Sequence, residues 1–330
     1  MTTTFSASRR RFTLMAGVAC AAGLAGLPPA WAQAFPNRPI RFIVPFPSGS
    51  GTDMTARVFA KKIGDLTGQG VVVENKPGGN GFIGVQTLLG APADGYTVFI
   101  GSNSTLSTNA ATFRKLPYDP LTDFKPITLL SRGPCLIIVP QNSPYRTLGE
   151  LVEDARKRPG ALNYGTGSVS YTLYSEWLNE QSRMKTTGVP YKGAGDAING
   201  VLAANVDFAV VDASGAIELV KSGKLRALAY TASQRSPLLP NVPSASEAGV
   251  PDFLAYNWVA AAVSARTPEP VAQRLGELFS QAAASAEVKD YYQRQSTTLI
   301  VSTPAELHNY QKEEIARWKR LAAIAKIELQ

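Results

Sequence analysis

The chain has almost none of the side chains that metal centres and many hydrolases depend on. Its 330 residues include one histidine, His308, and two cysteines. A zinc site takes its ligands mainly from histidine and cysteine, and a Ser-His-Asp triad needs a histidine as its base. We therefore expect no metal, no cofactor and no catalytic residues, and we expect His308 to lie at the surface.

Disulfides are excluded as a source of stability. Cys20 falls in an amino-terminal segment that we expect to be removed, which leaves Cys135 without a partner in the same chain. The stability of the fold must then come from buried apolar surface. The remaining length suits two domains, because domains commonly contain about 100–200 residues.

The first 32 residues have the features of an export signal. Three arginines at positions 9–11 precede an uncharged stretch at 12–27, and Ala30 and Ala32 form a small-x-small cleavage site. The stretch is short for a membrane-spanning helix, which needs about 20 residues. Residues 8–14, SRRRFTL, resemble a twin-arginine signal, and a Sec signal is the alternative. We expect cleavage after Ala32 and a periplasmic protein.

The charge of the chain does not indicate nucleic-acid binding. The formal net charge is +8 at pH 7 and falls by three when the three arginines of the signal are removed. No cluster of lysine and arginine interleaved with aromatic residues follows the signal. We therefore expect no nucleic-acid partner.

Residues 40–63, IRFIVPFPSGSGTDMTARVFAKKI, predict a strand, a loop of small residues and a helix. The apolar run 40–44 has the length and β-branched content of a strand, and the loop 47–51 combines proline, glycine and serine. Thr52 and Asp53 are the expected N-cap residues of the helix. The first turn of a helix leaves unpaired N–H groups beside a partial positive charge, so this loop is a candidate anion site. A plain strand-to-helix turn is the alternative.

Two later loops repeat this pattern. Residues 165–171, GTGSVSY, and residues 193–196, GAGD, each lie between a short apolar run and a helical pattern. A strand near 96–100 also runs into Ser102, Asn103 and Ser104. Alternating strands and helices favour a parallel sheet, in which ligands collect at the carboxyl ends of the strands. None of the loops matches a Walker sequence or a dinucleotide-binding fingerprint.

The rest of the chain continues the alternation of strands and helices. Further strands are expected at 135–139, 208–211, 225–230 and 258–263, helices at 147–158, 270–284, 288–295 and 304–325, and a turn-rich surface segment at 115–124. Trp177 and Trp258 are expected in the core. Tyr171 and Tyr191 suit either pocket walls or half-buried packing.

Several strings of residues, in order along the mature chain, resemble one family. They include FPNRPIRFIVPFPSGSGTD, VVVENKPGGNGFIG, KLPYDPLTDFKPITLL, VPYKGAG and SGKLRALAYTASQRSPLLPNVPSASEAGVP. Each string is weak alone, whereas their order and spacing are specific. The mature chain is similar throughout to the Bug family, the extracytoplasmic substrate-binding receptors of tripartite tricarboxylate transporters.

The resemblance implies a fold and a division of the chain. The fold is α/β, a two-lobed periplasmic-binding-protein fold of the Venus flytrap, type II-like kind, in which each lobe is a mostly parallel sheet flanked by helices. Lobe 1 is expected to combine residues 35–133 and 258–330, and lobe 2 to contain residues 134–257. The chain would cross between the lobes near Gly133 and Tyr256.

The resemblance also implies a site. The first loop would seat one carboxylate through main-chain donors and the Thr52 hydroxyl, and residues of lobe 2 would contact the distal part of the ligand. The family's usual PFPPGGSTD is PFPSGSGTD here, and GTGSVSYT replaces SSGxGTxxH, which leaves the distal ligand group open. Asp53, Asp196 and Asp212 lie where loops meet helices, and each is better explained as a helix cap or a partner of a ligand amine than as a catalytic group. The expected ligand-binding residues are Pro47, Ser48, Gly49, Ser50, Thr52, Asp53, Ser102, Asn103, Ser104, Gly167, Ser168, Tyr171, Tyr191, Lys192, Gly193 and Asp212.

The resemblance implies a receptor that binds its ligand and does not transform it. A monomeric periplasmic receptor would close on a small carboxylate ligand and deliver it to membrane transporter subunits. Two alternatives remain at this point. One is a secreted enzyme acting on small carboxylate esters, and the other is a sensory receptor that docks on a membrane kinase.

Overall fold

The structure, a computed structural model, describes residues 35–324 and residue 329. The expected signal at residues 1–32 lies outside the described residues. Every helix and strand among the described residues belongs to one compact unit that begins at Arg38.

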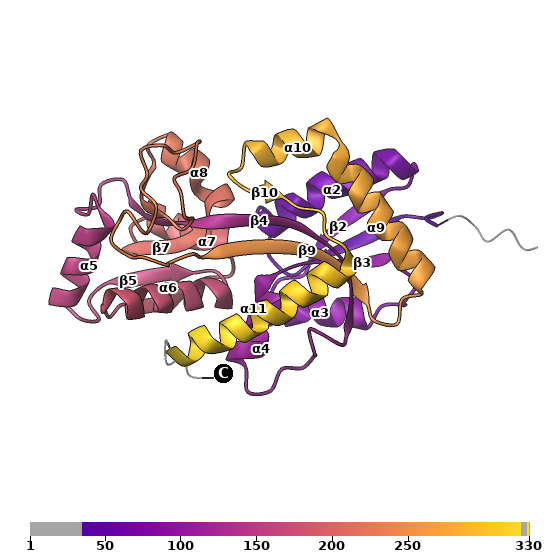
Figure 1. Ribbon diagram of the computed structural model, residues 1–330, viewed down its shortest axis with the longest axis horizontal. Coiled ribbons are helices and arrows are strands. Elements are labelled where there is room, and N and C mark those ends of the chain that lie inside the picture. Colours follow the sequence, from indigo (N-terminus) through magenta and orange to yellow (C-terminus); the bar gives the residue numbers. More distant parts are fainter. Residues whose placement is uncertain (1–34, 325–328, 330) are drawn as a thin grey trace, which may run out of the picture. The chain divides into compact units, whose positions relative to one another are not determined.

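The first part of the sheet is parallel. Strand β1 (Ile40–Val44) pairs in parallel with β2 (Val71–Asn75) on one side and with β3 (Thr97–Ser102) on the other. Helices α2 (Gly51–Thr67) and α3 (Phe82–Leu89) connect these strands, as Figure 1 shows. The apolar strand 40–44 and the helix that follows it are confirmed.

A long strand runs through the middle of the sheet. Strand β4 spans Phe124–Pro140, although only 135–139 was expected as a strand. Its first part pairs antiparallel with β9 (Tyr256–Ser264), and its last part pairs with two further strands, β7 (Phe208–Asp212) and β8 (Leu225–Tyr230). The prediction failed because prolines and a glycine in residues 125–134 look like turn signals. Shifts of register near Pro126 and after Leu129 absorb residues that cannot continue a regular ladder.

The remaining strands form the other end of the sheet. Strand β5 (Asn163–Thr166) pairs in parallel with β6 (Thr187–Pro190) and with β7 (Phe208–Asp212). Strand β8 (Leu225–Tyr230) pairs antiparallel with β4. The order of the strands is β2-β1-β3-β9-β4-β7-β5-β6, and β8 and the short β10 (Thr298–Leu299) also pair with β4. The strands expected at 208–211, 225–230 and 258–263 are confirmed.

Helices cover this sheet (Figure 1). The helix expected at 147–158 is α5, whose Thr147 and Glu150 form a reciprocal capping box. The helices expected after residue 269 are also confirmed. The remaining helices are α4 (Asn109–Thr112), α5 (Leu148–Lys157), α6 (Val169–Ser182), α7 (Ala194–Leu202), α8 (Ala213–Lys221), α9 (Glu269–Ala284), α10 (Ala286–Gln293) and α11 (Pro304–Ile324), with a π-helix at Ser104–Thr108 and a 3-10 turn at Gly79–Gly81.

Two apolar clusters form the core on which α11 packs. Trp258 is fully buried in one cluster together with Leu307, and its indole Nε1 donates to Glu314 at 3.1 Å. Trp177 is in the other cluster, where Trp318 of α11 lies against Tyr174 with ring centroids 5.0 Å apart. Both tryptophans are therefore core residues, as expected. Helix α11 contacts both clusters.

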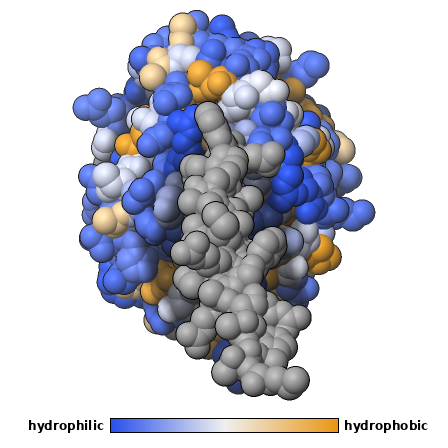
Figure 2. All heavy atoms as spheres, turned by 90° about the vertical axis from the view of Figure 1, so that its right-hand side faces the viewer, coloured by the Kyte–Doolittle hydropathy of each residue, from blue (hydrophilic) through white to orange (hydrophobic). Residues whose placement is uncertain are grey.

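Few large apolar side chains are exposed among the described residues. Figure 2 shows a face on which hydrophilic residues predominate and hydrophobic residues are scattered. His308 is partly exposed. Within residues 35–324 no helix combines the length and apolar character that crossing a membrane requires.

Candidate functional site

The first loop turns into α2 two residues before the earlier of the two expected N-caps. Ser50, rather than Thr52 or Asp53, is the N-cap, and its Oγ accepts from the Asp53 backbone N–H at 3.2 Å. Gly49 has a φ of +83°, which a residue with a side chain rarely adopts. The glycine turns the chain, the serine caps the helix, and the first amides of α2 face the end of the loop.

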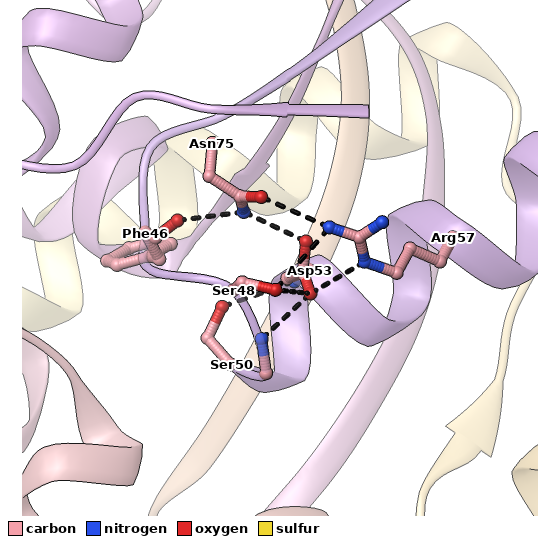
Figure 3. Close-up of polar contacts among 7 residues, drawn as sticks. Phe46, Ser48, Ser50, Asp53, Arg57 and Asn75 are labelled. Carbon is pink, nitrogen blue, oxygen red and sulfur yellow. Dashed lines mark hydrogen bonds and ion pairs between the residues drawn. The ribbon is translucent and has the colours of Figure 1, made fainter. Parts of the chain in front are cut away.

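Asp53 stabilises this loop from inside. Figure 3 shows its carboxylate among donors from three segments: the Gly49 N–H at 2.8 Å, Arg57 Nε at 3.0 Å and Asn75 Nδ2 at 2.8 Å. Burial alone would raise the pKa of Asp53, but the bonds from Arg57, Gly49 and Asn75 outweigh it and lower the pKa below its ordinary value. Asp53 therefore remains ionised and holds the loop in shape.

A small cavity of about 20 Å³ lies where three helices begin. The start of α2 contributes Ser50, Gly51 and Thr52, while Ser168 precedes α6 and Ala194 opens α7. We call this space the inner cavity. The other residues that line it are Phe46, Ser102, Ser104, Gly167, Tyr171, Asp212 and Asn257. Its volume is that of about one water molecule, so it accommodates a single small polar group.

A larger cavity of about 520 Å³ adjoins the inner one. We call it the outer cavity. The two share Phe46, Ser104, Gly167 and Ser168, so they lie side by side. The other lining residues of the outer cavity are Pro45, Gly78, Gly79, Asn80, Gly81, Thr166, Val169, Thr172, Pro190, Tyr191 and Lys192. Among these described residues Lys192 carries the only charge.

Hydroxyl groups join the two sides of these cavities. Ser104 Oγ lies 3.1 Å from Ser168 Oγ and 2.9 Å from Ser170 Oγ, and Thr108 Oγ1 lies 2.9 Å from Ser170 Oγ. Ser104 and Thr108 come from the π-helix after β3, whereas the other two residues lie at the start of α6. The two sides are therefore in direct hydrogen-bond contact in this structure.

Two of the glycines expected in the site, Gly167 and Gly193, are closely approached by atoms of neighbouring segments. A Cβ at Gly167 would lie 2.1 Å from the Gly193 carbonyl carbon, which no real contact permits. A Cβ at Gly193 would lie 3.0 Å from Cδ of Pro47. The tip of the first loop thus touches the turn before α7, and a side chain has no room at Gly167 and little room at Gly193.

Asp212 lies beside the first loop and not with Lys192. Its Oδ1 accepts from the Tyr171 hydroxyl at 2.7 Å, and its Oδ2 accepts from Ser214 Oγ at 2.8 Å. A Cβ at Gly51 would lie 2.7 Å from the same Oδ2. Burial and the nearby Asp212 charge raise the pKa of the Tyr171 hydroxyl well above its ordinary value, so it stays a donor. Asp212 is therefore a negative group at the inner cavity, which favours a ligand cation and opposes an anion.

Asp212 also faces a second small cavity of about 20 Å³ on the far side of Gly51. Thr55, Ser131 and Asn257 line it together with residues of α10 and the segment after it. The pKa of Tyr291 there is raised to about 12 by burial and by the charges of Asp212 and Asp53. The charge of Asp212 thus borders both small cavities.

The structure brings most of the expected residues together. Ser50, Thr52, Ser102, Ser104, Gly167, Ser168, Tyr171 and Asp212 line the inner cavity, Tyr191 and Lys192 line the outer one, and Pro47 touches Gly193. Ser48, Gly49, Asp53 and Asn103 line neither cavity. Ser48 and Gly49 are exposed, whereas Asn103 is fully buried and its amide makes no hydrogen bond in the described part of the chain.

Sequence reasoning missed Phe46, Gly51 and Asn257. Phe46 and Gly51 stand directly beside expected residues, so extending the first loop by its neighbours would have found them. Asn257 lies in β9, more than 150 residues after Ser104, and no local pattern marks it. The described residues contain no group of three or more histidine, cysteine or acidic side chains that could hold a metal ion.

Comparison with known proteins identifies the family. A family model described as tripartite tricarboxylate transporter family receptor matches residues 55–329. The chain belongs to this family. BugT of Bordetella pertussis is 32% identical over 304 residues, which is 90% of this chain and 91% of BugT.

Solved structures agree. An R. palustris protein solved with adipate has a TM-score of 0.86 and 30% identity, covering 89% of this chain and 99% of that one. MatC from Rhodopseudomonas palustris, with bound malate, has a TM-score of 0.83 and 29% identity, covering 87% and 99%. The expected two-lobed α/β fold of periplasmic binding proteins is thereby confirmed, and the chain is a receptor of the Bug and TctC kind.

Proposed function

We propose that this receptor binds a small carboxylate in the adjacent inner and outer cavities and delivers it, unchanged, to a tripartite tricarboxylate transporter. The observation that carries the proposal is the convergence of the starts of α2, α6 and α7 on one cavity. Helix starts present main-chain N–H donors and a partial positive charge to an anion. Solved relatives that hold adipate and malate support a carboxylate as the ligand.

We assign one end of the ligand to the inner cavity and the rest to the outer one. The amides at the start of α2, with the hydroxyls of Thr52 and Ser102, would hold a carboxylate against the opposing charge of Asp212. Each hydrogen bond to a charged group contributes about 1.5–3 kcal/mol. Three such bonds contribute about 4.5–9 kcal/mol together, which exceeds a repulsion of about 3 kcal/mol. Packing contacts would supply the rest of the about −8 kcal/mol that corresponds to micromolar binding.

We propose that the lobes divide as the sequence suggested, with residues 35–133 and 258–330 in lobe 1 and 134–257 in lobe 2. The pairing of Gly133 with Asn257 and of Pro134 with Tyr256, where β4 leaves β9, supports crossings at these points. A ligand that touches both lobes stabilises the closed arrangement only by contacts that the open one lacks. The hydroxyl contacts between Ser104 and Ser170 would form part of that closed arrangement.

The proposal includes export and assembly. A signal at residues 1–32, used by the Sec or the twin-arginine route and cleaved after Ala32, would place a monomeric receptor in the periplasm. The membrane subunits of the transporter would receive the ligand from the closed form. A sensory role would need a kinase as the partner instead.

The proposal is tested by asking whether the receptor binds a small carboxylate and leaves it chemically unchanged. The mature chain from Gln33 is purified and analysed by native mass spectrometry, and its thermal unfolding is followed with a panel of small carboxylates. We expect at least one acid to raise the midpoint and to be recovered unchanged. The absence of any effect from carboxylates, or hydrolysis of small carboxylate esters at a catalytic rate, would refute the receptor proposal.

A further inference from the structure

The last part of α11 packs into the core of the opposite lobe. The apolar cluster that contains Trp177 consists, among the described residues, of members from 134–257, the range proposed for lobe 2, and of four residues from outside that range. The four are Ala111 of α4 and Trp318, Leu321 and Ala322 of α11. Trp318 is fully buried where α11 reaches α6, and it lies against Tyr174 (Figure 1). Residues assigned to lobe 1 thus complete the apolar core of lobe 2.

The first part of α11 is fixed to lobe 1. The strand before it, β10, pairs with β4, and Leu307 is buried in a cluster whose described members all fall in the ranges proposed for lobe 1. Gln311 is buried, and its Nε2 donates to the carbonyls of Leu106 at 2.6 Å and Pro120 at 2.7 Å. A buried amide that satisfies two main-chain carbonyls is costly to detach. Because α11 is one continuous helix, a rigid element is held by both lobes.

Arg317 adds a polar link between the lobes. Its Nη2 donates to the Leu254 carbonyl at 2.6 Å, and its guanidinium lies over the Trp177 ring, 5.7 Å from the centroid. Both of these partners belong to the proposed lobe 2. Its Nη1 pairs with Glu314 at 3.2 Å, and Glu314 accepts from Trp258 in lobe 1. The guanidinium therefore bridges the lobes at the surface, whereas the bonds of α11 to lobe 1 are buried.

These contacts share one face of α6 with a hydroxyl at the inner cavity. Ser170, Tyr174 and Trp177 follow one another at intervals of four and three residues, which places them on the same side of a helix. Ser170 faces Ser104, and the two aromatic residues face α11. Because α6 is continuous over this stretch, a rotation that separates Ser104 from Ser170 also moves α6 relative to α11. Opening the cleft and keeping every contact of α11 are therefore incompatible.

We propose that α11 is a third connection between the lobes, and that its residues 317–324 leave lobe 2 when the cleft opens and dock again when it closes. This inference rests on the proposed function and lobe division. The helix stays with lobe 1, where its bonds are buried. Arg317 and Trp318 line none of the three cavities described above. They nevertheless contribute to ligand affinity, because their docking favours the closed arrangement that the ligand binds.

The release is tested by the reactivity of a thiol on α11. Leu321→Cys places it four residues after Arg317, at a position that is 7% exposed, and the other cysteine of the mature chain, Cys135, is fully buried. We expect N-ethylmaleimide to modify this thiol in the ligand-free receptor at least about tenfold faster than the thiol of Leu275→Cys, as followed by mass spectrometry. Leu275 is the matched control, since it is a buried leucine of α9 in lobe 1.

Locking the lobes together tests whether the release depends on the cleft. The hydroxyl oxygens of Ser104 and Ser170 are 2.9 Å apart, so Ser104→Cys and Ser170→Cys should form a disulfide on oxidation. In a receptor that also carries Leu321→Cys, this disulfide should slow modification of the α11 thiol at least about tenfold. Saturating adipate should slow it in the receptor without the disulfide.

Arg317→Lys measures the contribution to affinity. Lysine keeps a charge beside Glu314 but lacks the fork that also reaches the Leu254 carbonyl. We expect the affinity for adipate, measured by isothermal calorimetry, to fall about three- to tenfold. Arg320→Lys makes the same change at an exposed position of α11 and should alter the affinity by less than about twofold. Thermal unfolding shows whether each variant is folded.

The outcomes separate this inference from the proposed function. A Leu321→Cys thiol that reacts as slowly as the Leu275→Cys thiol, or that the disulfide does not protect, would overturn the inference and leave a carboxylate receptor. Unchanged adipate affinity in folded Arg317→Lys would overturn it too. If the disulfide protects the thiol and no small acid binds, the release of α11 is supported and the proposed function is wrong.

Discussion

Asp212→Asn tests the electrostatics of the inner cavity. Asp212 is 5% exposed, and its charge is stabilised by the hydroxyls of Tyr171 and Ser214 rather than by a cation. Asp212 Oδ2 closely approaches Gly51 at the start of α2, where a Cβ would lie 2.7 Å from it, so we take a separation of about 5 Å between Asp212 and a ligand carboxylate held there. At an effective dielectric constant of about 20, two like charges at that distance repel by about 3 kcal/mol.

The substitution keeps the shape of the side chain and removes this repulsion. We expect the affinity for adipate and benzoate to rise by about 1–3 kcal/mol, or roughly five- to 150-fold, after allowance for screening by water in an open cleft. A ligand with an amine next to its carboxylate should show the opposite change, because it would lose a salt bridge of similar size. The sign of the change therefore distinguishes simple acids from amino acids.

The assay is isothermal calorimetry at constant ionic strength, with urea unfolding to verify that the variant is folded. Asp252→Asn is the matched control, since Asp252 is exposed and asparagine tolerates its φ of 62°. If folded Asp212→Asn bound every simple acid at least tenfold more weakly, while Asp252→Asn did not, the placement of the ligand carboxylate beside Asp212 would be wrong.

Three further predictions concern the loops. Gly167→Ala should weaken binding at least about tenfold in calorimetry, because its Cβ would meet the Gly193 main chain at 2.1 Å, and an unchanged affinity would show that this approach is unnecessary. Asp53→Asn should lower the free energy of unfolding by about 1–3 kcal/mol. Because the folded pKa of Asp53 is lowered, its contribution is present above about pH 4 and is lost as the pH falls through that lowered value, so urea unfolding should show wild type and variant converging in acid. Ser170→Ala removes hydroxyl contacts to Ser104 and Thr108 and should weaken ligand binding by about 0.5–1.5 kcal/mol per lost bond, whereas tighter binding would contradict a closed-state role.

Local signals explain what the sequence predicted correctly. Glycine and serine mark the turns into α2, α6 and α7, and alternating strands and helices bring those turns to the same edge of a sheet. The role of Asp53, in α2, was less accessible from the sequence, because it depends in part on Asn75 at the end of β2. The type of the residue was visible in the sequence, but its partner was not.

Long-range pairing explains what was missed. Pro126 and Pro134 read as turn signals, yet β4 continues through both because β9 and the strands beyond it supply partners along its length. Asn257 lines the inner cavity only because β9 returns beside β4. The geometry of β7 and α8 places Asp212 against Gly51, a proximity that no local pattern in the sequence indicates. Such positions depend on which strands become neighbours, and one sequence does not contain that information locally.

The most direct test of the account is native mass spectrometry of the mature receptor incubated with adipate, followed by denaturation and analysis of the released ligand. The account predicts one adipate per chain, lost from the Gly167→Ala variant and recovered with its mass unchanged. A receptor that retains no small acid under these conditions, or that releases a chemically altered one, would contradict it.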